Sequence, residues 1–353
     1  MKAYLKEKIL SQPSKMITYA TYISEALYHP KWGYYIKQEE KVGRGGDFIT
    51  TSNISDIYGR IMAKWFLNLM KEHDLPTKVC EIGAGNGRFA AAFLDEWSRI
   101  TGEPLQYFIV DESPYHRELQ KEILPIGEQV FQVENLEELK PFIGVVFSNE
   151  LFDALPVHVV NKKDGTMMEV MVSVENDQFV EKPVLLENSM IKQFLKESNL
   201  TLVDNQRIEI PLAMGELVQR ISQMLERGFV ITVDYGYTDE EWMEPIHRDG
   251  SLRGYSKHEQ VHNVLLNPGE MDITSHIHFD GLIRSGEKEG LRFVSKQRQD
   301  EFFLSIGLLQ ELEDHYDPNP FSKVGRRNRA IRSLILPSGM SSMFQVLIQK
   351  KGI

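Results

Sequence analysis

The sequence lacks the features that mark disulfide-rich, membrane-spanning and nucleic-acid-binding proteins. Its 353 residues include one cysteine, Cys80, which cannot form an intramolecular disulfide. No apolar run reaches the roughly 18 residues that a membrane-spanning helix needs, so we expect no membrane-spanning helix. Lysine and arginine number 40 against 51 aspartate and glutamate residues, so the net charge of −11 excludes the overall basic footprint of a nucleic-acid binder. The N-terminus has neither a long apolar segment nor an arginine-rich leader, and we expect a cytoplasmic protein.

From residue 78 onward the sequence alternates between apolar segments of strand length and segments with helical periodicity. Strands are predicted at residues 78–82, 105–110, 129–133, 144–148, 229–233, 291–297 and 344–349. Because buried strands separated by helices form parallel sheets covered on both faces, we expect an α/β fold with a Rossmann-like sheet of about seven strands. Ligands of such sheets bind at the carboxyl ends of the strands.

Four segments are predicted along the chain. They are 1–75, with N-terminal helices and a loop rich in glycine; 76–156, the first part of the core sheet; 157–225, an inserted α+β region with a hairpin; and 226–353, the rest of the core with a second insertion at about 237–285. Helical spacing of Ile17, Ile23 and Leu27 indicates the first helix. The Asp164-Gly165 pair, between two strand-like segments, is typical of a hairpin turn.

The first core strand runs into a loop with glycines at alternate positions, namely Gly83, Gly85 and Gly87. Glycine lets the backbone approach a ligand closely, and the helix that follows offers free N–H groups. A dinucleotide fingerprint would need its third glycine where Arg88 stands. Glu81, at the head of the loop, suits an ammonium group better than a phosphate, which favours S-adenosylmethionine. Asp111 ends the next strand and could accept hydrogen bonds from both ribose hydroxyls, but NAD enzymes also use an acid there. A plain strand-to-helix turn is the alternative.

Polar residues also follow the fourth core strand. Asn149, Glu150 and Asp153 lie there, with Pro156 limiting any helix to a short turn. One turn would place the two carboxylates on the same side. Paired carboxylates could hold a guanidinium group while it accepts a methyl group, a reaction that depends mainly on in-line positioning. The alternative is a cluster that only caps the turn.

Short motifs distributed along the chain resemble the MidA-type family of S-adenosylmethionine-dependent methyltransferases, over about residues 13–310. In chain order they are Tyr34-Tyr35, Gly46-Asp47-Phe48-Ile49-Thr50, Ile54-Ser55, Glu81-Ile82-Gly83, 149–157, Asp234-Tyr235-Gly236, Leu252-Arg253-Gly254-Tyr255 and 268–274. The mitochondrial member of this family is an arginine methyltransferase that assists assembly of respiratory complex I. The resemblance implies a class I S-adenosylmethionine methyltransferase fold, with the cofactor bound by the glycine loop and Asp111. It also implies that residues 46–50, with Asp47 and Thr50, line the active site beside the cofactor.

The chain departs from the family pattern at three places. Thr51, Ser52 and Asn53 stand where the family has a small residue, proline and glutamate. The glycine loop reads Gly-Ala-Gly-Asn-Gly instead of Gly-Pro-Gly-Arg-Gly, and Met340-Ser341 replaces a Met-Gly pair. The missing carboxylate at position 53 concerns the substrate pocket more than the cofactor site.

These observations predict an S-adenosylmethionine-dependent methyltransferase that modifies an arginine of a partner protein. The predicted catalytic residues are Glu150, Asp153 and Asn149, and the predicted cofactor-binding residues are Glu81, Gly83, Gly85, Gly87, Asp111, Asp47 and Thr50. A non-catalytic assembly protein with the same fold and a small-molecule methyltransferase are the alternatives. The expected partner is a protein substrate, and we expect no nucleic-acid partner. We expect no membrane span. The sequence leaves open whether the chain forms a homodimer.

We expect no metal site. His276 and His278 alternate on a predicted strand, but no third ligand accompanies them. The basic residues Arg326, Arg327 and Arg329 are interpreted as a solvated helix face.

Overall fold

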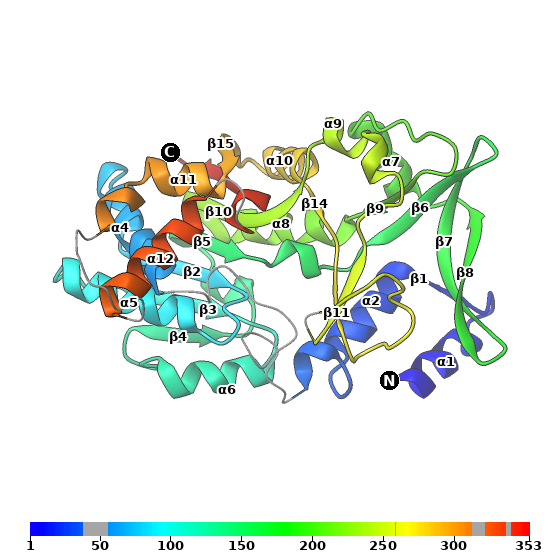
Figure 1. Ribbon diagram of the computed structural model, residues 1–353, viewed down its shortest axis with the longest axis horizontal. Helices are drawn as coiled ribbons and strands as arrows, with labels where there is room; N and C mark the ends of the chain where they lie inside the picture. Colours follow the sequence, from blue (N-terminus) through cyan, green and yellow to red (C-terminus); the bar gives the residue numbers. More distant parts are fainter. Residues whose placement is uncertain (38–55, 258, 313–321, 337–339) are drawn as a thin grey trace.

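A computed structural model describes residues 1–37, 56–257, 259–312, 322–336 and 340–353. Two sheets lie at opposite ends of the elongated molecule, and a third, small sheet lies between them (Figure 1). Within the described ranges, no helix is long and apolar enough to cross a membrane.

The largest sheet confirms the predicted α/β fold. Its continuous strand order is β4-β3-β2-β5-β10-β16-β15, and β14 pairs with the end of β10. The strands are β2 (Lys78–Ile82), β3 (Gln106–Val110), β4 (Val130–Val133), β5 (Phe142–Asn149), β10 (Leu225–Tyr237), β14 (Ile277–His278), β15 (Arg292–Arg298) and β16 (Phe344–Lys351). From β4 to β10 neighbouring strands are parallel, and β16 is antiparallel to both β10 and β15.

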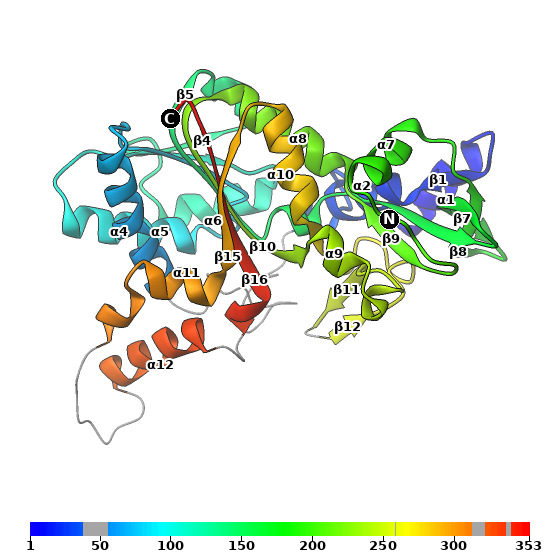
Figure 2. The same cartoon turned by 90° about the horizontal axis from the view of Figure 1, so that it is seen from above.

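Helices cover both faces of this sheet, as Figure 2 shows from above. One layer contains α4 (Ile57–Glu72), α5 (Arg88–Ile100), α11 (Gln299–Ser305), η5 (Leu308–Glu311), α12 (Lys323–Ile335) and η6 (Met340–Met343). The other contains η2 (Leu136–Leu139), α8 (Leu212–Met224) and α10 (Phe279–Lys288), while α6 (Pro114–Ile123) lies beside α5. Side chains of a strand alternate between the two faces of the sheet. Val145 and Phe147 therefore pack into the apolar core on the face covered by α4 and α5, and Val146 packs into the apolar core on the face covered by α8 and α10.

The second sheet combines the predicted insertion with the N-terminal segment. Its strands are β1 (Met16–Thr18), β6 (His158–Lys163), β7 (Thr166–Glu175), β8 (Gln178–Leu185) and β9 (Arg207–Ile210). α1 (Lys2–Ser11) and α2 (Tyr19–Tyr28) share an apolar core with it, and α7 (Ser189–Glu197) follows β8. The hairpin turn is confirmed, since Asp164 and Gly165 both have positive φ angles, 49° and 76°. Ile17 does not begin a helix; it pairs with Val172 in the sheet.

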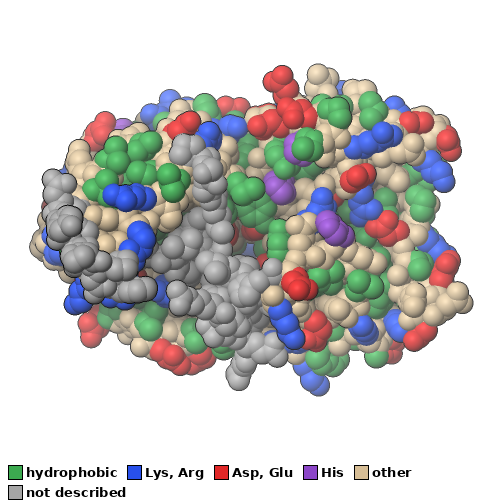
Figure 3. All heavy atoms as spheres, viewed as in Figure 1, with side chains coloured by type: hydrophobic (Ala, Val, Ile, Leu, Met, Phe, Trp, Pro, Cys, Tyr) green, Lys and Arg blue, Asp and Glu red, His purple; other side chains and the backbone are tan. Residues whose placement is uncertain are grey.

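Short elements connect the two ends of the molecule. They are η1 (Tyr34–Ile36), η3 (Phe152–Ala154), α9 (Asp239–Trp242), η4 (Pro245–His247) and the three-stranded sheet of β11 (Arg253–Ser256), β12 (Glu259–Val261) and β13 (Asp272–Thr274). On the face drawn in Figure 3, basic and acidic side chains are interspersed over the coloured surface.

A pair of glycines sets the close approach of β5 and β10. Gly228 lies opposite Gly144, and a Cβ atom on Gly228 would come 1.8 Å from the Gly144 carbonyl oxygen. Gly228 also has a φ of +146°, which side chains rarely adopt. This contact holds in register the two strands whose carboxyl ends carry Asn149 and Asp234.

Replacing Gly228 by alanine should therefore destabilise the fold by about 3 kcal/mol or more, because the strands must separate. Urea denaturation measures the effect. Gly102→Ala is the matched control, since its Cβ would meet no atom within 4 Å, and its stability should change by no more than about 1 kcal/mol. Equal denaturation midpoints for the two variants would contradict this role of Gly228.

Candidate active site

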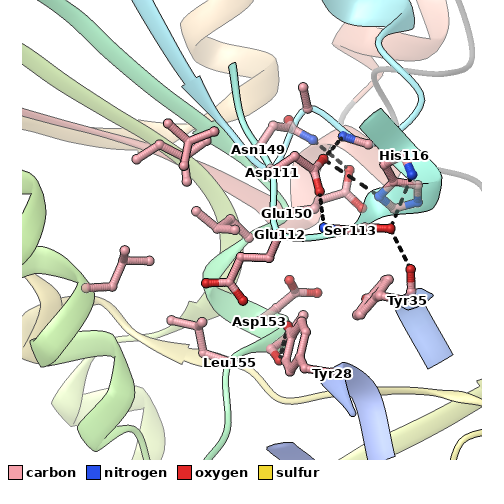
Figure 4. Close-up of a pocket in the computed structure, with 18 of the residues that line it drawn as sticks. Tyr28, Tyr35, Asp111, Glu112, Ser113, His116, Asn149, Glu150, Asp153 and Leu155 are labelled. Atoms are coloured by element: carbon pink, nitrogen blue, oxygen red, sulfur yellow. Dashed lines mark hydrogen bonds and ion pairs between the residues drawn. The ribbon is translucent and has the colours of Figure 1, made fainter. Parts of the chain in front are cut away.

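A cavity of about 840 Å³ lies at the carboxyl ends of β2, β3, β5 and β10. This volume is near the upper end of the range typical of small-molecule sites, roughly 300–1,000 Å³. Figure 4 shows side chains from several segments turned toward it. The N-terminal segment contributes Tyr28 and Tyr35, and the small sheet contributes Tyr255 and Asp272. The cavity therefore lies where the two ends of the molecule meet.

The glycine loop has the backbone conformation that its sequence predicts. Gly83, Gly85 and Gly87 have φ angles of +74°, +54° and +78°. A Cβ on Gly83 would come 2.9 Å from Leu151 Cδ1, whereas a Cβ on Gly85 would meet no atom of the described part of the chain within 4 Å. Gly85 therefore presents bare backbone to open space in the cavity wall. Gly87 caps the N-terminus of α5, which begins at Arg88, and has the left-handed conformation.

Asp111 is joined directly to this loop. Its Oδ2 accepts hydrogen bonds from the Gly85 N–H, at 3.1 Å, and from Gln120 Nε2, at 3.2 Å. Its Oδ1 accepts from the Ser113 N–H at 3.0 Å. Gln120 also donates to the Gly85 carbonyl at 2.8 Å, which fixes the loop against α6. Sequence reasoning named Asp111 and Gly85 but missed Gln120, because nothing in the helix pattern marks it.

Glu81 is buried beneath the loop, at the end of β2. The Tyr107 hydroxyl donates to its Oε2 at 2.7 Å. Burial, with Asp111 nearby, raises the pKa of Glu81 to about 8 against the opposing effect of that hydrogen bond. A neighbouring cation would restore its ionised form, so the site favours a positively charged group.

The turn after β5 is held by one buried carboxylate. Asp234 Oδ2 accepts from the N–H groups of Phe152, at 2.9 Å, and Asp153, at 3.3 Å. Its Oδ1 accepts from the Tyr235 N–H at 2.9 Å. Glu150, which precedes this turn, has a φ of +51° and donates its N–H to the Val233 carbonyl at 2.9 Å. Three-residue helix η3 thus forms in place of a full helical turn.

Asp153 faces the cavity with one unpaired oxygen. Tyr235 Oη donates to its Oδ2 at 2.6 Å, whereas its Oδ1 is buried and has no hydrogen-bond partner among the described residues. Burial raises the pKa of Asp153 to about 6. A buried carboxylate oxygen without a donor is costly, so a ligand group that donated a hydrogen bond to this atom would remove that cost.

Two stacked tyrosines form the wall opposite the β-strand ends. The rings of Tyr28 and Tyr35 lie 5.5 Å apart. Tyr28 Oη donates to the Ala154 carbonyl at 2.9 Å, and Tyr35 Oη donates to Asp272 Oδ1 at 2.7 Å. Ser113 Oγ donates to the Tyr35 carbonyl at 2.6 Å, a contact visible in Figure 4. Tyr35 and Asp272 lie in motifs that sequence analysis noted without assigning them to the site, and Tyr28 carries no sequence signal.

The cavity is strongly acidic. Its described lining includes the carboxylates of Glu81, Asp111, Glu112, Glu134, Glu150, Asp153, Glu216 and Asp272. Arg220 is the only lysine or arginine among those described lining residues, and Glu137 pairs with it at 2.9 Å. Such a cavity attracts cations.

Two further groups of sequence predictions concern the loop at 46–53 and the histidine pair His276 and His278. Asp47 and Thr50, with 51–53, lie outside the described residues, so their roles stay predictions. His276 lines the cavity, and His278 donates from Nε2 to the Glu209 carbonyl at 2.8 Å. In the described part of the chain, no three histidine, cysteine or acidic side chains gather as a metal ion would need.

Comparison with known proteins shows what this chain is similar to. Residues 61–296 match the model of a family described as S-adenosyl-L-methionine-dependent methyltransferase. The mitochondrial protein arginine methyltransferase NDUFAF7 of Danio rerio is 24% identical, over 97% of this chain and 85% of that protein. Its Drosophila melanogaster homologue is 26% identical, over 81% of this chain and 70% of that protein. A crystal structure of a Burkholderia thailandensis protein bound to S-adenosyl-homocysteine has a TM-score of 0.91 and 28% identity, covering 100% of this chain and 92% of that one.

Replacing Gly85 by valine should weaken S-adenosylhomocysteine binding about tenfold or more, since a steric conflict of about 1.4 kcal/mol already gives that factor. The branched side chain would enter the open space beside Asp111 at a positive φ. Calorimetry measures the affinity. Gly127→Val is the control, because Gly127 also has a positive φ and open surroundings but lies outside the cavity. Equal affinity of both variants would remove the loop from the binding site.

Proposed function

The chain belongs to the family of S-adenosyl-L-methionine-dependent methyltransferases, and from this premise we propose that it methylates an arginine side chain of a partner protein. The named relatives that are arginine methyltransferases support the choice of arginine. The acidic cavity supports it independently, because a guanidinium is a permanent cation that carboxylates bind with two hydrogen bonds.

The residues of the glycine-loop side fit the cofactor. Gly85 leaves room for a ligand against its backbone, and Asp111 lies beside it at the cavity edge, where a ribose hydroxyl would donate to Oδ1, which accepts from the Ser113 N–H. The pKa of Glu81 is raised by burial, and an ammonium group bound beside it would favour the ionised form of its carboxyl group. When bound, S-adenosylmethionine supplies an activated methyl group on a positively charged sulfonium.

The observation that carries the arginine proposal is the unpaired Oδ1 of Asp153. This oxygen is buried at the cavity wall, and Tyr235 holds the other oxygen of the same carboxylate. An N–H of a guanidinium would satisfy it. Glu150 lines the same cavity, so the two acids can orient one planar group.

Methylation would form a bond from a guanidinium nitrogen to the methyl carbon while the carbon–sulfur bond of the sulfonium breaks and leaves its electron pair on sulfur, and the nitrogen would then lose one proton. We assign the proton to Asp153. A carboxyl with a pKa of about 6 is ionised at neutral pH, yet it is more basic than an ordinary aspartate.

The experiment that tests the proposal follows the label from S-adenosylmethionine carrying a radioactive methyl group, in lysate with and without the purified chain. Acid precipitation separates proteins from small molecules, and hydrolysis identifies the labelled residue. Label recovered as methylarginine in protein supports the proposal. Label in the soluble fraction indicates a small-molecule methyltransferase, and no enzyme-dependent label indicates an assembly protein. The cytoplasmic location and the homodimer stay predictions.

Replacing either active-site acid should strongly slow transfer but preserve the cofactor site. Glu150→Gln and Asp153→Asn should each lower kcat about 100-fold or more, the size of effect typical of removing an acid–base or charge-stabilising group. Affinity for S-adenosylhomocysteine, measured by calorimetry, should change little. Glu96→Gln is the control, a buried carboxylate outside the cavity, and should retain activity. Full transfer by both active-site variants would rule out their assigned roles.

Transfer should also depend on pH through Asp153. Below its pKa of about 6 the carboxyl is protonated, so it carries no negative charge to pair with a guanidinium and cannot take up the proton that the nitrogen loses. The value of kcat/KM should therefore rise about tenfold per pH unit up to about pH 6 and then level off. The residual activity of Asp153→Asn should lack this inflection. The same inflection in that variant would assign it to another group.

A further inference from the structure

Tyr58 is a buried phenol that neither the sequence motifs nor the proposed reaction uses. It lies in the first turn of α4 and is 0% exposed. Its ring makes edge-on contacts with Phe89, at 5.3 Å between centroids, and Phe303, at 5.2 Å. Packing therefore fixes the direction of its hydroxyl, which donates to Asn149 Oδ1 at 2.8 Å.

Asn149 bonds both to Tyr58 and to Glu150, one of the two proposed active-site acids. Its Nδ2 donates to Glu150 Oε1 at 3.0 Å, and the two side chains lie together in Figure 4. An ionised carboxylate only accepts hydrogen bonds, so the NH₂ end of the amide must face Glu150. The carbonyl end then faces Tyr58, whose hydroxyl must donate. Burial, with Glu150 and Glu81 nearby, raises the pKa of Tyr58 well above its usual range and keeps it protonated.

The backbone of Glu150 is already fixed, but its side chain needs a separate constraint. Its φ of +51° and its N–H bond to Val233 set the direction of the Cα–Cβ bond. A glutamate side chain retains several rotamers beyond that bond, and ordering them carries an entropy cost. The bond from Asn149 holds one carboxylate oxygen in place before a substrate arrives.

We propose that Tyr58 is a positioning residue, whose hydroxyl orients the Asn149 amide so that Asn149 holds the Glu150 carboxylate for the cationic substrate. This inference rests on the proposed function of Glu150. Without the hydroxyl, the amide can rotate by half a turn. Its oxygen would then face Glu150 and repel the carboxylate.

The test uses methylguanidine as a probe of the acceptor side, with S-adenosylhomocysteine present and binding followed by NMR titration. Tyr58→Phe keeps the ring and removes only the hydroxyl. Its Kd for methylguanidine should rise about fivefold to tenfold, the equivalent of one lost hydrogen bond of about 1 kcal/mol. Its affinity for S-adenosylhomocysteine should stay at the parent value. Tyr22→Phe is the matched control, since Tyr22 is equally buried and donates to the Val264 carbonyl away from the cavity.

A double-mutant cycle with Asn149→Ala distinguishes positioning from a general packing effect. If Tyr58 acts through Asn149, Tyr58→Phe should change the Kd less than about twofold in the Asn149→Ala background. A parent-like Kd for the single variant Tyr58→Phe would overturn the inference. The same loss in both backgrounds would overturn it too, because Tyr58 would then act by another route. If the parent chain fails to bind methylguanidine while binding S-adenosylhomocysteine, the proposed function itself fails and this inference fails with it.

Discussion

The capture of three backbone N–H groups by Asp234 is the interaction on which the acceptor side of the site depends. This carboxylate is fully buried at the end of β10 and holds Phe152, Asp153 and Tyr235 around it. Burial and the nearby Asp153 raise the pKa of Asp234, and the N–H groups of Tyr235 and Phe152 oppose that rise. The parallel register of β5 and β10, which places Asn149 beside Val233, brings these groups within reach of one another. The turn that carries Glu150 and Asp153 is thus held by the end of the neighbouring strand β10.

The two sides of the cavity are made in different ways. The cofactor side depends on backbone, because three glycines with positive φ bring the loop close to Asp111. The acceptor side depends on side chains that distant segments bring together. Tyr35 and Asp272 meet across 237 positions of sequence, and the Ser113 hydroxyl joins Tyr35 to the cofactor side. The acceptor side therefore combines acids fixed at strand ends of the central sheet with side chains from outside it, and the outer side chains can change while the cofactor site is retained.

Sequence reasoning predicted the sheet and the polar groups at its strand ends because a general rule places ligands there. It could place Asp111 near the glycine loop on that basis, but it could not find Gln120, whose role depends on how α6 packs. Tyr28 likewise enters the cavity only because the N-terminal segment docks on the inserted sheet. Strand β1 contradicts the helix that the spacing of Ile17 predicts, because three residues are too short to display a strand period and the sheet partner at Val172 lies far along the chain. The roles of Asp47 and Thr50 stay predictions.

The most direct test of the central claim is a crystal structure of the chain with S-adenosylhomocysteine and methylguanidine together. We expect the ribose against Asp111, the guanidinium against Asp153 Oδ1 and Glu150, and the cofactor sulfur facing the guanidinium. An adenosine group over Asp153, or a guanidinium bound outside the cavity, would contradict the division of this cavity into a cofactor side and a cationic acceptor side.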